Sequence, residues 1–370
     1  MDTALSTDAY KFAMAQAGFP GRRETFYLSF RHGGWQYNPI DWSAVIKHPD
    51  TLKGVESAFL AQYGYEMPPA MRKALDDEFT VSAIPQHAWF FEREPIVTIT
   101  GPSFLVSFLE PLVIRYQYQI QLATEIMRPE HMEDLVVTCP EQKTIAESVL
   151  DRLSHTSDPG GIRIVIASDA YRKSCQEAAA EVLSRVSADR VFEVGMRAAS
   201  CREEHQICLT ALRDLGITAT SNVRLARDLD MTPVGTMGHE HVQRWGSDLA
   251  AFRAMRDMRA AGTPSYLLDT FDTLTSGIPA ALQVYREDPH DFSVRYDSGD
   301  KVVQYMHAHS IFSEANVDVK HVIEDGLRPA DLDTFEMLRR ELTHIPDHDQ
   351  VYGFGGGFVS HHWRNANPFT

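Results

Sequence analysis

The second half of the chain alternates short apolar runs with longer amphipathic stretches. From Ile162 onward the runs recur about every 25 to 30 residues, a spacing that suits a strand followed by a helix. Such a series predicts a parallel sheet of βα units, most simply an irregular (β/α) barrel. An open doubly wound sheet is the alternative, which the lack of a GxGxxG motif after a strand disfavours. The expected strands are residues 162–167, 191–194, 217–220, 232–236, 266–270, 292–296, 319–324 and 351–354.

The first hundred residues have a different pattern. A helix is expected near residues 8–16 and strands near residues 24–30 and 96–100, with proline and glycine breaks between them. We therefore predict a smaller α+β domain over residues 1–105, with the chain end at 355–370 as an optional further part of it. The barrel domain is predicted to span residues 106–354.

Composition and charge narrow the classes of function. With 44% hydrophobic and 23% charged residues, the chain is typical of a globular protein in water. Its 35 basic and 51 acidic residues give a net charge of −16, which disfavours nucleic acid and anionic lipid as partners. Small phosphorylated ligands are still allowed, because a pocket needs only a few local cations.

Targeting signals are not evident in the sequence. The longest apolar stretch, residues 104–114, contains Glu110 and Pro111 and is too short to cross a bilayer. The first residues do not read as a signal peptide, so we expect a cytoplasmic protein. The four cysteines form no CxxC pair, which argues against a disulfide framework or a structural zinc site.

Polar residues follow nearly every expected strand. In a barrel these strand ends converge on the active site, although each residue taken singly is more often a helix N-cap. The glycine-rich run 353–357 suits a phosphate, since exposed backbone N–H groups favour an anion. Arg197 and Arg295 suit bidentate contacts with phosphoryl oxygens. The other candidates at strand ends are Thr220, Ser221, His239, Asp269, Asp272, Asp297 and Asp325.

Among these candidates, His239 has the sequence context that most strongly indicates a chemical role. It follows a strand among Gly and Thr residues, and Glu240 beside it is expected to orient the ring or raise its pKa for nucleophilic or acid–base chemistry. His239 and His241 also form an HxH pair, as do His307 and His309. With Asp297 or Asp325 these pairs suggest a second hypothesis, a metal-dependent barrel hydrolase. A protein that binds ligands without chemistry is a third class.

Seven segments of the chain form an ordered set of motifs: residues 7–11 (TDAYK), 193–197 (EVGMR), 220–222 (TSN), 235–240 (GTMGHE), 268–272 (LDTFD), 295–300 (RYDSGD) and the terminal glycine run. Taken in order, these motifs resemble those of nicotinate phosphoribosyltransferases, which are type II phosphoribosyltransferases related to nicotinamide phosphoribosyltransferase. This resemblance implies an irregular α/β barrel with a second domain, assembled as a homodimer whose active sites lie between subunits. It also implies transfer from phosphoribosyl pyrophosphate with Mg²⁺ to nicotinate, coupled to ATP hydrolysis through a phosphohistidine.

The resemblance assigns roles to individual positions. His239 resembles the phosphorylated histidine, and Tyr10 resembles an aromatic residue that stacks on the pyridine ring from the neighbouring subunit. Asp297, with Asp325 beside it, would stabilise positive charge on the ribose in an oxocarbenium-like transition state. No protein metal ligand is assigned, because Mg²⁺ would arrive with the substrate. The expected substrate-binding set is Asp8, Tyr10, Arg197, Thr220, Ser221, Arg295, Asp325, Gly355, Gly356 and Arg364.

The choice of pyridine substrate depends on two features. Ser221 stands where nicotinamide enzymes carry an acidic residue, and a serine hydroxyl donates to a carboxylate that an acid would repel. That favours nicotinate. Residues 355–357 followed by Arg364 resemble the nicotinamide enzymes instead, so nicotinamide transfer and a divergent, weakly active member are the alternatives.

Overall fold

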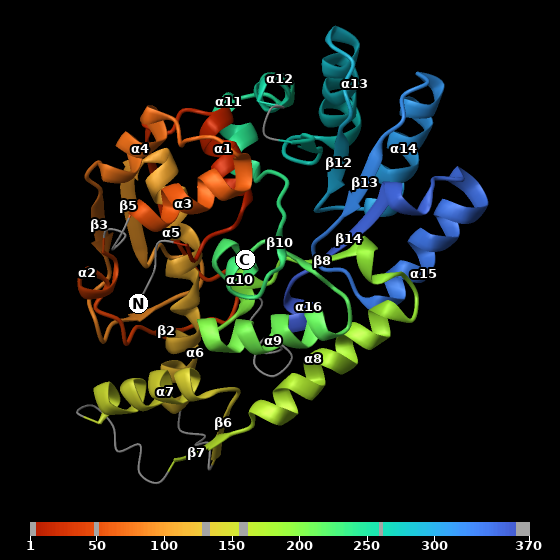
Figure 1. Cartoon of the computed structure of the whole chain (residues 1–370). Helices are drawn as coiled ribbons and strands as arrows, with labels where there is room; N and C mark the ends of the chain where they lie inside the picture. The colour runs from red at the N-terminus through yellow and green to blue at the C-terminus, as the bar shows by residue number, and fades with distance from the viewer. Residues whose placement is uncertain (1–4, 48–51, 128–133, 155–161, 259–261, 360–370) are drawn as a thin grey trace.

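The protein combines an α+β region with a curled parallel sheet covered by helices (Figure 1). The structure is a computed structural model that describes residues 5–47, 52–127, 134–154, 162–258 and 262–359. In Figure 1 the N-terminal elements lie on the left, and the strands of the large sheet fan out on the right. The α-helices are α1 (Tyr10–Ala17), α2 (Trp42–Val45), α3 (Leu52–Tyr63), α4 (Pro69–Asp76), α5 (Ser103–Arg115), α6 (Gln117–Ile126), α7 (Pro140–Leu153), α8 (Ser168–Leu183), α9 (Arg202–Asp214), α10 (Val223–Asp228), α11 (His239–Trp245), α12 (Asp248–Asp257), α13 (Ile278–Glu287), α14 (Lys301–Glu314), α15 (Pro329–Met337) and α16 (Gly356–Val359).

The large sheet has the strand order of a barrel. Its seven strands are all parallel and run in the order β10-β9-β8-β14-β13-β12-β11. The last strand pairs with the first, β14 with β8, and among the described residues only the pairing of β10 with β11 is missing from the cycle. The predicted irregular barrel is therefore confirmed, in an open and curled form. The strands are β8 (Val191–Glu193), β9 (Ala219–Thr220), β10 (Thr232–Pro233), β11 (Ser265–Leu267), β12 (Ser293–Tyr296), β13 (Lys320–Ile323) and β14 (Gln350–Phe354).

The run at residues 162–167, expected to begin the barrel, lies elsewhere. Its strand β7 (Arg163–Ile166) pairs with β6 (Asp134–Val137) in a separate two-stranded parallel sheet. The buried face of this sheet packs on α7, where Leu135 and Val137 join Val149 in one apolar cluster. A run of apolar residues indicates a strand but not the strand with which it pairs, and the prediction was wrong here for that reason.

Local signals explain where the helices of the barrel begin and end. Asp300 accepts a hydrogen bond from the backbone of Val303 and so caps α14, and Pro329 occupies the first turn of α15. Gly246, with a φ of 78°, ends α11 in the left-handed conformation. Strands β11 and β12 are buried on both faces, as expected for a parallel sheet covered by helices.

The N-terminal region is α+β, as predicted. Strands β1 (Arg23–Leu28), β5 (Val97–Pro102) and β3 (Thr80–Ala83) form an antiparallel sheet, and β2 (Gln36–Tyr37) pairs with β4 (Trp89–Phe90). Helix α5 packs Phe104 and Phe108 against Phe12 of α1 and Phe59 of α3. Residues 356–359 pack in the barrel core, whereas residues 360–370 lie outside the described part. The domain boundary after residue 105 stays a prediction.

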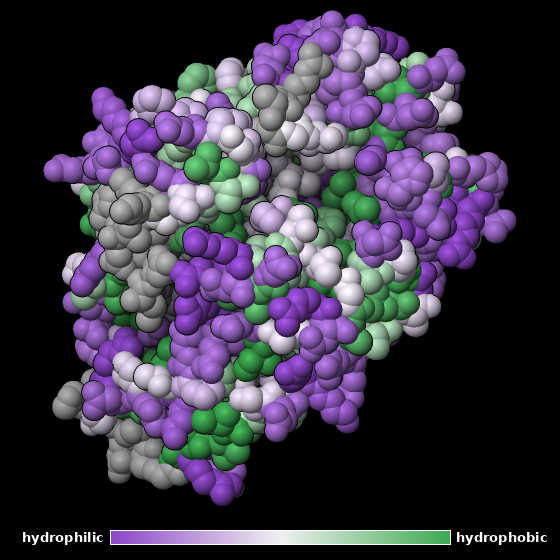
Figure 2. Space-filling model, in the orientation of Figure 1, coloured by the Kyte–Doolittle hydropathy of each residue, from purple (hydrophilic) through white to green (hydrophobic). Residues whose placement is uncertain are grey.

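The surface is mainly hydrophilic in the view of Figure 2. A hydrophobic patch appears low in that view, over the β6–β7 sheet, where Val136, Val165 and Ile166 are exposed. Within the described residues, we find no helix whose length and apolar character would let it cross a membrane.

Candidate functional site

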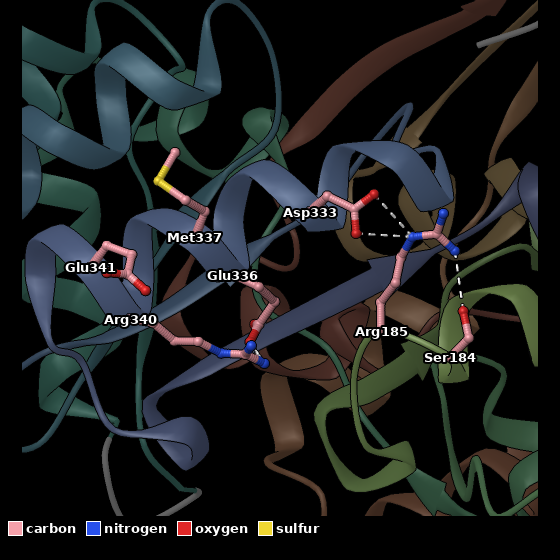
Figure 3. A pocket seen from close by; sticks show the side chains of 7 residues that line it. All are labelled: Ser184, Arg185, Asp333, Glu336, Met337, Arg340 and Glu341. Carbon is pink, nitrogen blue, oxygen red and sulfur yellow. Dashed lines mark hydrogen bonds and ion pairs between the residues drawn. The ribbon is translucent and has the colours of Figure 1, made fainter.

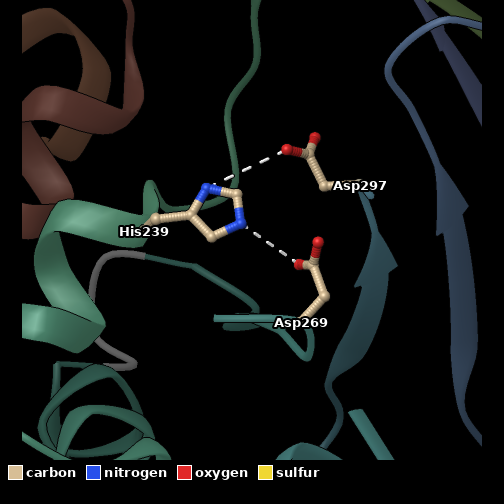
Figure 4. Close-up of side chains that lie close together, drawn as sticks. All are labelled: His239, Asp269 and Asp297. Carbon is tan, nitrogen blue, oxygen red and sulfur yellow. Dashed lines mark ion pairs between the residues drawn. The ribbon is translucent and has the colours of Figure 1, made fainter. Parts of the chain in front are cut away.

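His239 stands between two carboxylates at the carboxyl ends of the strands. It is the first residue of α11, and its Nε2 lies 3.3 Å from Asp269 Oδ1, whereas its Nδ1 lies 3.9 Å from Asp297 Oδ2. Figure 4 shows the ring held edge-on between these side chains, which follow β11 and β12. The structure thus brings together His239 and Asp297, which lie 58 positions apart in the sequence and were both predicted.

The two carboxylates favour the protonated form of His239. The hydrogen bond to Asp269 is the main cause of a raised His239 pKa, which burial and Arg295 oppose. Burial acts to raise the pKa of Asp269, but hydrogen bonds from His239 and Ser298 leave that pKa below its usual value. Ser298 donates its backbone N–H and its hydroxyl to Asp269 Oδ2, which fixes the carboxylate. Asp269 is thus placed to hold a proton on Nε2 and leave the Nδ1 lone pair available.

Arg295 is held beside Asp297 by protein groups. Its Nη1 donates to Thr236 Oγ1 at 2.7 Å and to the carbonyl of Met237 at 2.9 Å, and its Nη2 donates to Asp297 Oδ1. The same Nη2 lies 3.1 Å from Glu324 Oε2. Two carboxylates thus pair with Arg295, whereas its buried Nε has no hydrogen-bond partner among the described residues.

Glu324, rather than Asp325, supplies the carboxylate at the end of β13 that reaches Arg295. Burial raises the pKa of Glu324 to about 7, against the attraction of Arg295. Asp325 is exposed in the next turn, where its φ is 57°. The sequence placed Asp325 beside Asp297 because both follow strands, but it gave no signal that Glu324 would point inward.

The N-terminal segment lies along the strand end at residues 220–224. The backbone N–H of Ala9 donates to Ser221 O at 2.8 Å, and Asp8 forms a β-bridge with Asn222. Ser221 Oγ donates to Asp8 Oδ1 at 2.7 Å, and Thr220 Oγ1 donates to Glu193 Oε2 at 2.6 Å. Thr220, Ser221 and Asp8 are all buried. The structure therefore brings these predicted residues together, with the hydroxyls engaged by protein carboxylates.

Tyr10 and Arg197 extend the site toward the N-terminal region. The backbone and Cβ of Tyr10 approach Gly235 so closely that a Cβ added there would lie 2.7 Å from the Tyr10 nitrogen. The Tyr10 ring also lies beside Gly238, directly before His239. Arg197 follows β8 in a short 3-10 helix, with its Nε 3.8 Å from Asp8 Oδ2 and its Nη1 3.4 Å from Glu110 Oε1.

Glu240 does not orient His239, contrary to our expectation. It accepts hydrogen bonds from Lys11 Nζ at 2.9 Å and from Ser107 Oγ at 2.7 Å. Lys11 is 3% exposed and also lies 2.8 Å from Glu110 Oε2, so its ammonium group joins α1, α5 and α11. Sequence reasoning missed Lys11 and Glu110, because a charged residue in an amphipathic helix is normally expected to be exposed to solvent.

A second buried network supports the β8 strand end. Glu193 accepts from His205 Nε2 at 3.0 Å and also from the backbone N–H of Gly195. Asn222 Nδ2 lies 3.0 Å from His205 Nδ1, so the amide donates there and the ring proton is on Nε2. This chain of hydrogen bonds fixes the turn that carries Arg197.

The terminal glycine run lies against the same turn. A Cβ on Gly195 would meet Val359 Cγ2 at 2.6 Å and the carbonyl oxygen of Gly355 at 2.7 Å, so only glycine permits this approach. Gly355 and Gly356 are half-buried where β14 gives way to α16. Arg364, the other predicted residue at the chain end, lies outside the described residues.

The HxH pairs do not form ligand sets. Burial lowers the pKa of His241 to about 4, and its Nε2 lies 3.4 Å from the carbonyl oxygen of Ala251. His307 Nδ1 is bonded to the carbonyl of Val303 within its own helix. Among the described residues, one cluster of three possible metal ligands is found, formed by His239, Asp269 and Asp297 with ligand atoms within 4.8 Å of one another.

A shallow polar hollow lies at the opposite end of the barrel (Figure 3). It is lined by residues directly after α8 and by residues of α15 and of the turn that follows it, two segments that lead toward the starts of strands. Two ion pairs lie there, because Arg185 is 3.2 Å from Asp333 and Arg340 is 3.4 Å from Glu336. It is separate from the His239 site.

Curated relatives support the resemblance by sequence. No family model matches the chain. A nicotinate phosphoribosyltransferase from Bacillus subtilis (strain 168) is 34% identical over 116 residues, 30% of this chain and 23% of that protein. One from Xanthomonas euvesicatoria pv. vesicatoria (strain 85-10) is 28% identical over 177 residues, 42% of this chain and 43% of that protein. The aligned part thus spans less than half the length of either relative.

Solved structures extend the likeness over the whole chain. The nicotinate phosphoribosyltransferase from Vibrio cholerae has a TM-score of 0.60 at 15% identity, over 99% of this chain and 83% of that one. That from Porphyromonas gingivalis has a TM-score of 0.54 at 18% identity, over 98% and 86%. At such identities the likeness concerns the fold. Together with the sequence matches, it confirms the predicted resemblance to nicotinate phosphoribosyltransferases.

Proposed function

We propose that the protein is a nicotinate phosphoribosyltransferase of NAD salvage. It would join nicotinate and phosphoribosyl pyrophosphate, giving nicotinate mononucleotide and pyrophosphate. The observation that carries this proposal is the group of His239, Asp297 and Arg295 at the barrel's carboxyl end, in a chain whose relatives bear that name. We further propose a cytoplasmic homodimer with shared active sites, and no nucleic acid or membrane partner.

The transfer step is a substitution at the ribose C1. The C1–oxygen bond to pyrophosphate breaks, positive charge develops on the sugar, and the pyridine nitrogen forms the new bond. Asp297 would stabilise that charge, since a fixed carboxylate acts most strongly on charge that appears in the transition state. Arg197 and Arg295 would bind phosphate, pyrophosphate or carboxylate oxygens. Tyr10, beside Gly235, would pack on the pyridine ring.

The carboxylates at the site fit Mg²⁺ carried by the substrate. Asp269 Oδ1 is buried, lies 3.3 Å from His239 Nε2, and belongs with Asp297 to the cluster described above. Carboxylate oxygens suit Mg²⁺, whereas the imidazole nitrogen of the cluster does not, so a site shared with phosphate oxygens fits better than one made by protein alone. When bound, Mg²⁺ would neutralise phosphate charge.

ATP coupling would use His239 as a nucleophile. With Asp269 holding a proton on Nε2, Nδ1 would attack the γ-phosphorus of ATP, so that a P–N bond forms as the bond to ADP breaks. Water would later release the phosphate. His239 is 38% exposed, which leaves the ring open to such a partner.

The test is turnover by the purified protein with phosphoribosyl pyrophosphate, Mg²⁺ and either pyridine, with and without ATP. We expect nicotinate mononucleotide, formed faster with ATP. Turnover of nicotinamide alone would reject the substrate assignment, and no turnover of either would favour the binding-only class. The contacts of the HxH pairs do not support the alternative of a metal-dependent hydrolase. The cluster around His239 still allows a test of that alternative, which predicts that the protein retains stoichiometric zinc or manganese after dialysis.

A further inference from the structure

The thiols of Cys139 and Cys201 meet in a buried seam between two helices. Their Sγ atoms lie 3.4 Å apart, although the residues are 62 positions apart in the sequence. Cys139 precedes α7 and Cys201 precedes α9, and each sulfur accepts a backbone N–H from the first turn of its own helix, from Gln142 and Glu204 respectively. Two helix N-termini therefore converge on one pair of sulfur atoms.

Reciprocal hydrogen bonds hold the two helix ends in register. The backbone N–H of Glu141 donates to Glu203 Oε2 at 2.7 Å, and that of Glu203 donates to Glu141 Oε2 at 2.8 Å. Gln142 Nε2 also donates to Ser200 Oγ at 2.8 Å. These bonds keep the sulfur atoms at a distance that a small side-chain movement converts into a covalent bond, since S–S is about 2.05 Å.

The two sulfur atoms have different chemical environments. The hydrogen bond from Cys201 lowers the pKa of Cys139, and the same contact raises the pKa of Cys201. The helix N-terminus also favours a thiolate. Both thiols are buried, and each is followed at once by an exposed residue, Pro140 or Arg202.

We propose that Cys139 and Cys201 form a peroxide-sensitive thiol pair that oxidises to a disulfide joining α7 to α9. The Cys139 thiolate attacks a peroxide oxygen and breaks the O–O bond, which leaves a sulfenic acid and hydroxide, and the proton that the Cys139 thiol released converts the hydroxide to one water. Cys201 sulfur then attacks the Cys139 sulfur and releases a second water as the S–S bond forms. Two thiols and one peroxide thus give one disulfide and two waters.

The crosslink would fix the end of the turn that carries Arg197. That turn runs from Gly195, which packs against Gly355, to Cys201 at the start of α9. The reduced pair holds the far end of the turn by hydrogen bonds alone. The proposal does not depend on the proposed activity, because the thiol chemistry can be measured without substrate.

The first experiment treats the folded full chain with hydrogen peroxide, alkylates it and maps the peptides without reduction. We expect a crosslink between the peptides holding Cys139 and Cys201, two hydrogens lighter than the reduced pair and reversed by dithiothreitol. The crosslink should also raise the thermal midpoint of unfolding. Cys175→Ser is the matched control and should still form it. Absence of the crosslink, or a crosslink between Cys175 and Cys208 in its place, would overturn the proposal.

Two variants test the direction of the chemistry. Cys201→Ser should accumulate a sulfenic acid on Cys139 that dimedone labels, whereas Cys139→Ser should leave Cys201 unlabelled. Circular dichroism and the thermal midpoint of each reduced variant establish that it is folded. Equal labelling of both variants, or of neither, would contradict the assignment of Cys139 as the attacking sulfur.

Discussion

Replacing Lys11 by methionine removes the ammonium group that joins three helices at the base of the site. Methionine keeps the length of the side chain and removes its charge, so the change leaves Glu110 and Glu240 without their main partner. Breaking a buried ion pair in this way costs about 3–5 kcal/mol. Glu240 and Glu110 are 20% and 22% exposed and keep contacts with Ser107 and Arg197, so we expect the lower end, about 3 kcal/mol.

The assay is unfolding in urea, followed by tryptophan fluorescence and by ellipticity. The midpoint should fall with little change of slope. Lys73→Met, an exposed lysine in α4, is the control and should stay within about 0.5 kcal/mol of the wild type. A double variant with Glu240→Gln should cost less than the sum of the two single changes. A loss below about 1 kcal/mol for Lys11→Met would refute the reasoning.

The dependence of stability on acid pH gives a second test of the contacts among Lys11, Glu110 and Glu240. Burial acts to raise the Glu110 pKa, but Lys11 and Arg197 hold that pKa below its ordinary value of 4.5. A lowered carboxyl pKa contributes stability above the unfolded value, and this stability is lost as pH falls through the folded value. The difference in free energy of unfolding between Lys11→Met and the wild type should therefore shrink below about pH 4. A constant difference down to pH 2 would place its cause elsewhere.

Three further predictions concern the strand ends. Asp269→Asn should lower the His239 pKa, measured by NMR titration of the ring, because the main cause of its raised value is that carboxylate; an unchanged value would contradict the assignment. The folded Glu324 carboxyl keeps its proton up to a pKa of about 7, so the wild type should lose stability as pH rises from about 4.5 to 7. Glu324→Gln should remove this loss, and identical pH profiles of stability for the two proteins would contradict the reasoning. Gly195→Ala should cost about 1–3 kcal/mol by overpacking and weaken phosphoribosyl pyrophosphate binding in calorimetry, whereas Gly21→Ala, with no atom within 4 Å of its added Cβ, should be neutral; equal effects would reject the packing argument.

The strand ends could be predicted from sequence because a parallel barrel directs them to one place. Each of the seven predicted runs from residue 191 onward forms a strand of the sheet, and His239, Asp297 and Arg295 meet at their ends. The pattern could not indicate pairing partners, so β7 was assigned to the wrong sheet. It also could not distinguish Glu324 from Asp325, since adjacent residues leaving a strand point in different directions.

Contacts that form only when distant elements pack together could not be predicted from the sequence. Lys11, Glu110 and Glu240 lie on three helices far apart in the chain, and no local pattern marks them as partners. Likewise, no local pattern indicates that the Ser221 hydroxyl donates to Asp8, while its predicted contact with a substrate carboxylate stays a prediction. Such pairs follow from how the N-terminal segment lies along residues 220–224, which apolar periodicity does not encode.

The central claim is that the His239 site transfers a phosphoribosyl group to nicotinate. The most direct measurement is phosphorus NMR of the protein with phosphoribosyl pyrophosphate and Mg²⁺, before and after nicotinate is added. The account predicts that free pyrophosphate and a mononucleotide phosphate appear together, and only after nicotinate is present. Release of pyrophosphate or phosphate without nicotinate, with no mononucleotide, would contradict it and favour the hydrolase.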